Sequence, residues 1–338
     1  MRQVWITKAG PPDVLQVREA PDPTPGAGEV RIRVEACGIN FADLMARMGV
    51  YPDAPKIPCV VGYEVAGRID ALGEGVTTFQ VGQAVLALTR FGGYSDIVCV
   101  PTISVFPRPP QMSAQVGAGM LVNYVTAYQL LIVMGSLKQG DRVVIQSAAG
   151  GVGLAALDLC RLYGAETIGI ASAAKHAFLQ SRGLDHAIDS RGTDGAGQIR
   201  QISKDEGVQI ILDSQGGPSW RQSYSLLAPT GRLVVFGASS LASGDRRSLR
   251  SLLSLVLTMP RFTPLRLMDD NRGILGVNVG HLWHRPDLVR GWAEQLLTWY
   301  AEGKITPQID CAFPFVQAPA AHQYLHDRKA IGKVLLEP

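Results

Sequence analysis

The sequence lacks the cysteine and histidine patterns that hold metal ions or build disulfide frameworks. Its five cysteines include no C-x-x-C pair, and none of its six histidines precedes His176. Scattered cysteines predict reduced thiols in a cytoplasmic protein. We read no apolar window of about 18 residues and no signal peptide in "MRQVWITKAG", so no transmembrane segment is predicted. A net charge of +3 is too small to indicate nucleic acid as a partner.

What the chain does have is length, apolar residues and glycine. Its 338 residues are 46% hydrophobic and include 37 glycines, which allows two packed domains with many tight turns. The first third contains short runs bounded by turn residues, which predict the strands of a partly antiparallel, barrel-like domain. These runs are 29–37, 64–73, 83–88 and 94–100.

From about residue 124 strands alternate with helices, which predicts βαβ units and a parallel sheet. The expected strands are 141–147, 166–172, 186–189, 208–214 and 231–237. The tail ends in "GKVLLEP", a strand that can rejoin the first domain. We therefore predict an α/β fold in which a Rossmann-type, doubly wound parallel-sheet domain is inserted into a mainly β catalytic domain. The predicted boundaries are 124–264 for the dinucleotide-binding domain, and 1–123 with 265–338 for the catalytic domain.

A glycine cluster follows the first strand of the predicted parallel sheet. In "VVIQSAAGGVGLAAL" the residues Ala148, Gly150 and Gly153 occupy positions 1, 3 and 6 of a dinucleotide fingerprint, after a strand and at the start of a helix. Small residues let the backbone approach a pyrophosphate, and the helix N-terminus offers free N–H groups. The predicted contact residues are Ala149, Gly150, Gly151 and Val152.

The end of the next strand indicates which nicotinamide cofactor is used. NAD enzymes carry Asp or Glu there to bind the ribose 2′-hydroxyl. Here the strand ends in "IASAAK", so Ala171 or Ser172 holds that position, and Ser172 and Lys175 can bind a 2′-phosphate. NADPH is therefore the predicted cofactor. The alternative is that Ser172 caps the next helix and Lys175 is solvated.

No zinc site is predicted. A catalytic zinc needs three protein ligands, but Cys37 is followed by Asn40 at the place of a second ligand, and Tyr63 precedes Glu64 where a histidine is expected. The pairs "HLWH" and "HQYLH" have ligand-like spacing but no glutamate between their histidines and no nearby cysteine, so packing or solvated roles are expected.

Four segments in this order resemble one family. "CGINFAD", "VGYEVAG", "AAGGVG" and "IGKVLL" resemble the zinc-independent quinone oxidoreductase group of the medium-chain dehydrogenase/reductases, and "LVNYVTAY" and "ITPQIDCAFPF" are most similar to its vesicle amine transport protein homologues. The resemblance implies a GroES-like catalytic domain, NADPH and a homodimer. It departs at Ser190, where quinone reductases often have a 2′-phosphate-binding tyrosine. The residues it places around the nicotinamide and acceptor are Asn40, Asp43, Tyr51, Thr126, Phe236, Gly237 and Lys333.

Without a metal, the predicted chemistry is hydride transfer to an acceptor that needs little Lewis-acid help. Quinones meet this condition, and so do conjugated enones and alkenals, which stay as an alternative. Asn40 and Tyr51 are the predicted catalytic residues, as donors to a developing oxyanion. Their alternative roles are helix capping for Asn40 and packing for Tyr51. The segment 244–267 is apolar on one face and basic on the other. This pattern supports an alternative hypothesis, in which the protein is a non-enzymatic, NADPH-binding adaptor at a membrane surface.

Overall fold

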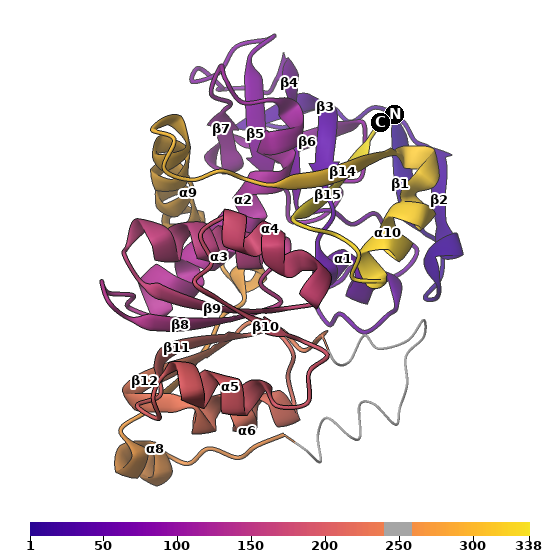
Figure 1. Cartoon of the computed structure of the whole chain (residues 1–338). Helices are drawn as coiled ribbons and strands as arrows, with labels where there is room; N and C mark the ends of the chain where they lie inside the picture. The colour runs from indigo at the N-terminus through magenta and orange to yellow at the C-terminus, as the bar shows by residue number, and fades with distance from the viewer. Residues whose placement is uncertain (240–258) are drawn as a thin grey trace.

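The structure, a computed structural model, describes residues 1–239 and 259–338. It confirms the α/β fold with a parallel sheet joined to a mainly β part. In Figure 1 the parallel sheet (the nucleotide part) lies below the antiparallel strands (the catalytic part), and the yellow C-terminal strands return to the upper half beside β3. Residues 244–258 of the predicted amphipathic segment lie outside the described residues.

The catalytic part is built on a seven-stranded sheet: six strands follow the order β14-β15-β3-β4-β5-β7, and the seventh, β6, pairs with β3. β1 and β2 form a separate two-stranded sheet. Alternate residues of β3, including Val30, Ile32 and Val34, are buried, as expected for strands with one face on a core. The strands are β1 Arg2–Ile6, β2 Leu15–Glu19, β3 Glu29–Gly38, β4 Glu64–Leu72, β5 Ala84–Leu88, β6 Ile97–Pro101, β7 Val105–Pro107, β14 Ile309–Pro314 and β15 Lys333–Glu337. The short helices are η1 Pro12–Val14, α1 Phe41–Arg47, η2 Thr102–Ser104, η7 Phe315–Gln317 and α10 Ala318–His326.

The nucleotide part has six parallel strands in the order β10-β9-β8-β11-β12-β13. Val143 and Ile145 of β8 face a cluster that includes α3, whereas Val144 faces a second cluster with α5 and α6, so both sheet faces are covered. The strands are β8 Arg142–Gln146, β9 Glu166–Ala171, β10 His186–Asp189, β11 Val208–Asp213, β12 Leu227–Val235 and β13 Gly273–Gly276. The helices are α3 Gly151–Leu162, η4 Ala173–Lys175, α4 His176–Ser181, α5 Gly195–Ile202, α6 Pro218–Ser225, α8 Pro264–Asp270, η6 Val279–His281 and α9 Pro286–Ala301.

One long apolar helix joins the two parts. It consists of α2 (Ala114–Tyr128) and a π-helical continuation, η3 (Gln129–Met134). The expectation that no run is long enough to span a bilayer is wrong for this segment, because 114–134 passes by length and composition. However, 67% of its most apolar window is buried inside the structure, where α2 packs on β3, β4, α3 and α9. The helix is apolar because it packs against both the catalytic part and the nucleotide part.

The pairing of strand β13 indicates where the nucleotide part ends. Residues 273–276 pair in parallel with β12, although the predicted boundary at 265 assigns them to the catalytic part. We propose that the chain leaves the nucleotide part after Gly276. Among the described strands β13 pairs only with β12, so it forms one edge of the six-stranded sheet.

A buried carboxylate fastens α3 to its neighbours. Asp158 on α3 is 1% exposed and accepts hydrogen bonds from the Tyr124 hydroxyl (2.7 Å), the Arg182 guanidinium (3.0 Å) and the Thr306 backbone N–H (2.8 Å). These partners come from α2, from the end of α4 and from the segment that leads to β14. One charged group therefore links four segments of both parts.

Candidate functional site

The glycine turn, residues 147–153, lies at the carboxyl end of the central strand β8. The strands β9 and β11 diverge on either side of β8, which is the switch point where ligands bind in doubly wound sheets. A Cβ built on Gly153 would lie 2.6 Å from the carbonyl oxygens of both Ser147 and Ala148, so only glycine lets α3 start this close to the strand. The first N–H groups of α3, from Gly151 to Gly153, are available to an anion.

The predicted 2′-phosphate residues lie at the adjacent strand end. Ser172 follows β9, and the Ser190 backbone N–H after β10 donates to the Ala171 carbonyl (2.9 Å), so both serines lie at one edge. The Lys175 ammonium has protein partners: it donates to the carbonyls of Arg328 (2.8 Å) and Ala330 (2.6 Å). Burial lowers its pKa from the usual lysine value. The Ser172 side chain makes no capping hydrogen bond, so the capping alternative is not supported.

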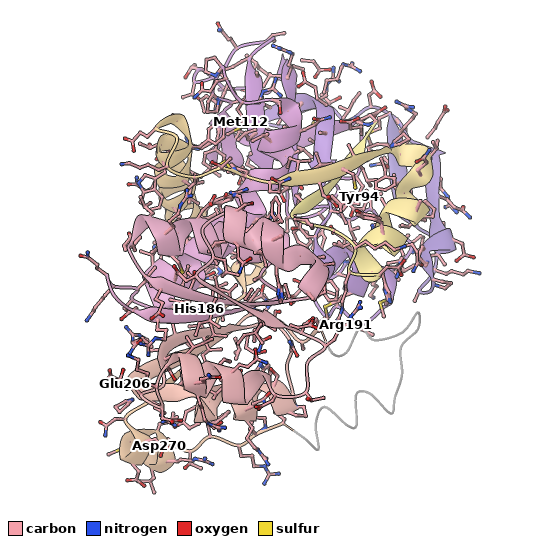
Figure 2. The ribbon with its side chains drawn as sticks, viewed as in Figure 1. Tyr94, Met112, His186, Arg191, Glu206 and Asp270 are labelled. Carbon is pink, nitrogen blue, oxygen red and sulfur yellow. The ribbon has the colours of Figure 1, made fainter. Side chains whose placement is uncertain are left out.

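Sequence reasoning did not select Arg191 at this edge. It follows Ser190 directly and its side chain is exposed (Figure 2). Figure 2 shows it near the level at which the nucleotide part meets the catalytic part. One feature of the sequence pointed to Arg191: it is a cation directly after Ser190, where the family often has a tyrosine. That feature is informative only once β9 and β10 are known to end at the same edge of the sheet.

The segment 328–332, here called the strap, connects the glycine turn to β15. The Gly332 backbone N–H donates to the Ala149 carbonyl (2.9 Å), and Gly150 and Gly332 form an isolated parallel bridge. The strap is also the segment held by Lys175. It ends at Lys333, the first residue of β15. The predicted cofactor residues Ala149, Gly150 and Lys175 are thus brought together by one short stretch of backbone.

A buried amide cluster, consisting of Asn40, Glu64 and Lys333, lies where β3, β4 and β15 meet α2. The Lys333 ammonium donates to Glu64 Oε1 (2.5 Å) and to Asn40 Oδ1 (2.7 Å). The second Glu64 oxygen accepts from the Val122 backbone N–H (2.9 Å). The Lys333 and Glu64 side chains are 3% and 0% exposed, whereas Asn40 is half-buried. The family resemblance placed Lys333 near the nicotinamide, but nothing in the sequence pairs it with Glu64, because the two residues are far apart in the chain.

Asp43 is hydrogen-bonded to the backbone next to this cluster. Its carboxyl accepts from the backbone N–H groups of Asn40 (2.7 Å) and Gly62 (3.1 Å) and from the Tyr94 hydroxyl (3.1 Å). Burial raises the Asp43 pKa to about 7 against the lowering effect of these hydrogen bonds. Tyr94 lies inside the catalytic part near α10 (Figure 2) and its hydroxyl is 3.1 Å from His322 Nε2. Asp43 is therefore a backbone anchor, not a substrate contact.

Tyr51 lies apart from the amide cluster, with no hydrogen bond to it among the described residues. It lines a hollow of about 390 Å³ with Ala46, Gly49, Ala54, Pro55, Lys56 and Ile57. Its hydroxyl faces Gly280, which follows β13, and would lie 3.4 Å from a Cβ at that position. The neighbouring Asp53 bonds His281 Nε2 (2.8 Å), so this loop touches the nucleotide part.

Thr126 and the end of β12 complete the predicted set. The Thr126 hydroxyl donates to the Val122 carbonyl (2.6 Å) one turn earlier on α2, next to the contact of Val122 with Glu64. The Phe236 backbone N–H donates to the Asp213 carbonyl (3.1 Å), which fixes Phe236 and Gly237 beside the end of β11. Thr126 therefore lies one helical turn from the contact of α2 with Glu64, and Phe236 and Gly237 lie near the glycine-turn edge.

The residues present do not fit a zinc ion. No group of three His, Cys, Asp or Glu side chains with metal-binding geometry occurs in residues 1–239 and 259–338. Cys37 is fully buried, and burial raises the pKa of its thiol, which opposes the thiolate that zinc requires. A protein cation, Lys333, lies beside Asn40 at one of the would-be ligand positions.

Comparisons with known proteins agree with this architecture. Residues 26–133 match the family described as the alcohol dehydrogenase GroES-like domain, and residues 182–336 match the zinc-binding dehydrogenase family. The human synaptic vesicle membrane protein VAT-1 homolog is 41% identical over 325 residues, which cover 96% of this chain and 82% of the relative.

Solved structures show the same fold. Escherichia coli quinone oxidoreductase complexed with NADPH is 26% identical with a TM-score of 0.87, and all of both chains is covered. The CurK enoyl reductase is 29% identical with a TM-score of 0.86, covering 99% of this chain and 98% of that one. The chain therefore belongs to the medium-chain dehydrogenase/reductases, in the quinone oxidoreductase group that also contains the VAT-1 homologues.

Proposed function

We propose that this chain is an NADPH-dependent, zinc-independent oxidoreductase that reduces quinones. The main support for the proposal is the buried amide cluster, which includes Asn40 at a position where a zinc enzyme would have a metal ligand. A lysine ammonium and an asparagine amide stand there in place of metal ligands, 2.7 Å apart. Such groups can stabilise a developing oxyanion but supply less polarisation than a metal. An acceptor that is already electron-poor, such as a quinone, suits this site.

The cofactor fits the glycine-turn edge. The α3 N–H groups from Gly151 to Gly153 would hold the pyrophosphate, and Ser172 with Lys175 would hold the 2′-phosphate. Thr126 and Asn40 would border the nicotinamide, with Phe236 and Gly237 beside it. Bound NADPH supplies a hydride, and the quinone takes up that hydride and one proton to become a hydroquinone.

On the acceptor side, Asn40 and Tyr51 would donate hydrogen bonds to the quinone oxygens. The Asn40 amide is half-buried and close to the Lys333 ammonium. Tyr51 lines the 390 Å³ hollow, and burial raises the pKa of its hydroxyl, which stays protonated as a donor. Asp43 would act only through the backbone of the Asn40 turn.

Two other functions have specific support. The likeness to the CurK enoyl reductase favours reduction of enones or alkenals by the same residues. The name of the human relative, a synaptic vesicle membrane protein, favours an NADPH-binding adaptor at membranes. NADPH oxidation measured in parallel with naphthoquinone, phenanthrenequinone and short alkenals separates these functions. Turnover with quinones supports the proposal, turnover with alkenals alone supports the second function, and liposome sedimentation without turnover supports the adaptor.

We also propose a cytoplasmic homodimer. All five cysteines are free thiols, as expected in a reducing compartment. The edge strand β13 leaves one row of backbone groups without a partner among the described strands, and a second copy could extend the sheet there. Light scattering of the purified protein, with a monomer as the contrary result, tests the assembly.

Tyr51→Phe is expected to lower kcat by about tenfold with weak acceptors, less than the ~10²–10³ of a fully committed oxyanion donor, because the site is open. NADPH affinity should stay unchanged. Steady-state kinetics and NADPH titration measure the two effects, with Tyr300→Phe as a control remote from the hollow. An unchanged kcat with every acceptor would leave Tyr51 as a packing residue.

The purified protein is expected to contain no stoichiometric zinc, and chelators should leave its turnover unchanged. The physical reason is the protonated, buried Cys37 and the absence of ligands at Asn40 and Tyr63. Elemental analysis checks this directly. A value of one zinc per chain would contradict the prediction.

A further inference from the structure

We infer that Lys333 is a positioning residue, which fixes the Asn40 amide so that its NH₂ group is the end offered to the acceptor oxygen. The inference rests on the proposed function and deepens it. Its basis is the 2.7 Å contact between Lys333 Nζ and Asn40 Oδ1. The sequence gives no reason to connect these residues, which are 293 positions apart.

The chemistry of the two groups determines the amide orientation. An ammonium has three N–H donors and no acceptor, so it can bond only the oxygen of a side-chain amide. The two ends of an asparagine amide are otherwise hard to distinguish and follow their hydrogen-bond network. Here the cation decides: the oxygen faces Lys333, and the NH₂ group lies at the opposite end.

The NH₂ group retains donor capacity. Its two protein neighbours, the Gly38 carbonyl and Glu64 Oε1, are both 3.5 Å from Nδ2, at the outer limit of a hydrogen bond. The Asn40 side chain is half-buried, so a small acceptor can reach it. A quinone oxygen that gains charge during hydride transfer would be a stronger partner than either of these.

The protein is built to hold the lysine in one place. A Cβ on Gly38 would lie 2.6 Å from Lys333 Cε, and a Cβ on Gly119 would lie 3.1 Å from its Cγ, so two glycines make room for its stem. Glu64 Oε1, 2.5 Å away, neutralises the ammonium, and the Val122 N–H holds the other carboxylate oxygen. The Asn40 backbone is fixed separately by Asp43. Lys333 therefore acts on the side-chain amide of Asn40 and not on its backbone.

The test removes the buried pair together. Glu64→Gln/Lys333→Met avoids leaving an unpaired buried charge, which would destabilise the protein. We expect kcat with naphthoquinone to fall about tenfold, with NADPH affinity and melting temperature little changed. Asn40→Ala should lower kcat by a similar factor. Adding Asn40→Ala to the double variant should lower it no further, because residues that act through one another are not additive. Lys304→Met, on the surface, is the matched control.

A second readout needs neither cofactor nor turnover. The chain has only four asparagines, Asn40, Asn123, Asn271 and Asn278. Selective ¹⁵N-asparagine labelling therefore gives four pairs of side-chain amide signals, one pair for each NH₂ group, and Asn40→Ala assigns one pair. In the double variant the Asn40 pair should move toward that of a solvated amide, while the other three pairs stay in place.

The outcomes separate this inference from the proposed function. An unmoved Asn40 signal, or kinetic effects that multiply, would overturn the positioning role. A loss of NADPH affinity in the double variant would make Lys333 a cofactor residue instead. If the unmutated protein turns over no quinone, the proposed function fails, and the amide signal still decides whether Lys333 orients Asn40.

Discussion

Lys175→Ala is expected to weaken NADPH binding by roughly ten- to a hundredfold and to leave NADH binding nearly unchanged. A hydrogen bond to a charged group contributes about 1.5–3 kcal/mol, and each 1.4 kcal/mol is about tenfold in affinity. The ammonium already donates to the Arg328 and Ala330 carbonyls, so one of its three N–H groups remains for the 2′-phosphate. NADH has no phosphate at that position and offers this donor no partner.

Titration of both cofactors by intrinsic fluorescence measures the difference, with Lys138→Ala as an exposed control on the same part. An equal loss for NADPH and NADH would mean that Lys175 acts only by holding the strap. The discrimination between cofactors would then rest on Ser172. Ser172→Ala in the same titration distinguishes these two cases.

Asp158→Ala is expected to lower the free energy of unfolding by about 3–5 kcal/mol, because removing one partner of a buried ion pair leaves the other uncompensated. Asp158 is 1% exposed and is the shared acceptor of Tyr124, Arg182 and the Thr306 N–H. For a unit of 150–250 residues this loss corresponds to a melting temperature lower by roughly 6–20 °C. Calorimetry measures the shift.

The matched control is Asp287→Ala, which removes an exposed ion pair with Arg285 and should change the melting temperature little. Asp158→Asn should fall between wild type and alanine, since an amide oxygen can still accept a hydrogen bond. An unchanged melting temperature in Asp158→Ala would show that the hydrogen bonds of Asp158 do not contribute to stability.

The elements that the sequence predicts well are those with a local signal. The run "VQIILDS" predicts a buried strand, and β11 covers Val208–Asp213; "GKVLLEP" predicts a closing strand, and β15 covers Lys333–Glu337. Apolar runs of this length between turn residues fit a parallel sheet covered on both faces. The glycine turn is predicted for the same reason, since strand, glycines and helix are contiguous in the chain.

What the sequence could not predict are partnerships across the chain. Glu64 and Lys333 are 269 residues apart, and Tyr94 and His322 are 228 apart. No periodicity connects such residues, because they meet only in the folded chain. The length of the apolar run 114–134 is a local property that our sequence analysis missed, whereas the burial of α2 between two parts is a tertiary property. The Lys175 contacts with the strap likewise depend on how the strap folds back.

The strand β15 has a consequence for how the protein is made. It pairs with β3 and β14 and delivers Lys333 to Asn40 and Glu64. During synthesis β3 leaves the ribosome early, whereas β15 follows after the whole parallel sheet. Domains generally fold as units in order of synthesis. The nucleotide part can therefore assemble on the ribosome before β15 emerges, and the cluster of Asn40, Glu64 and Lys333 can form only after that strand has been made.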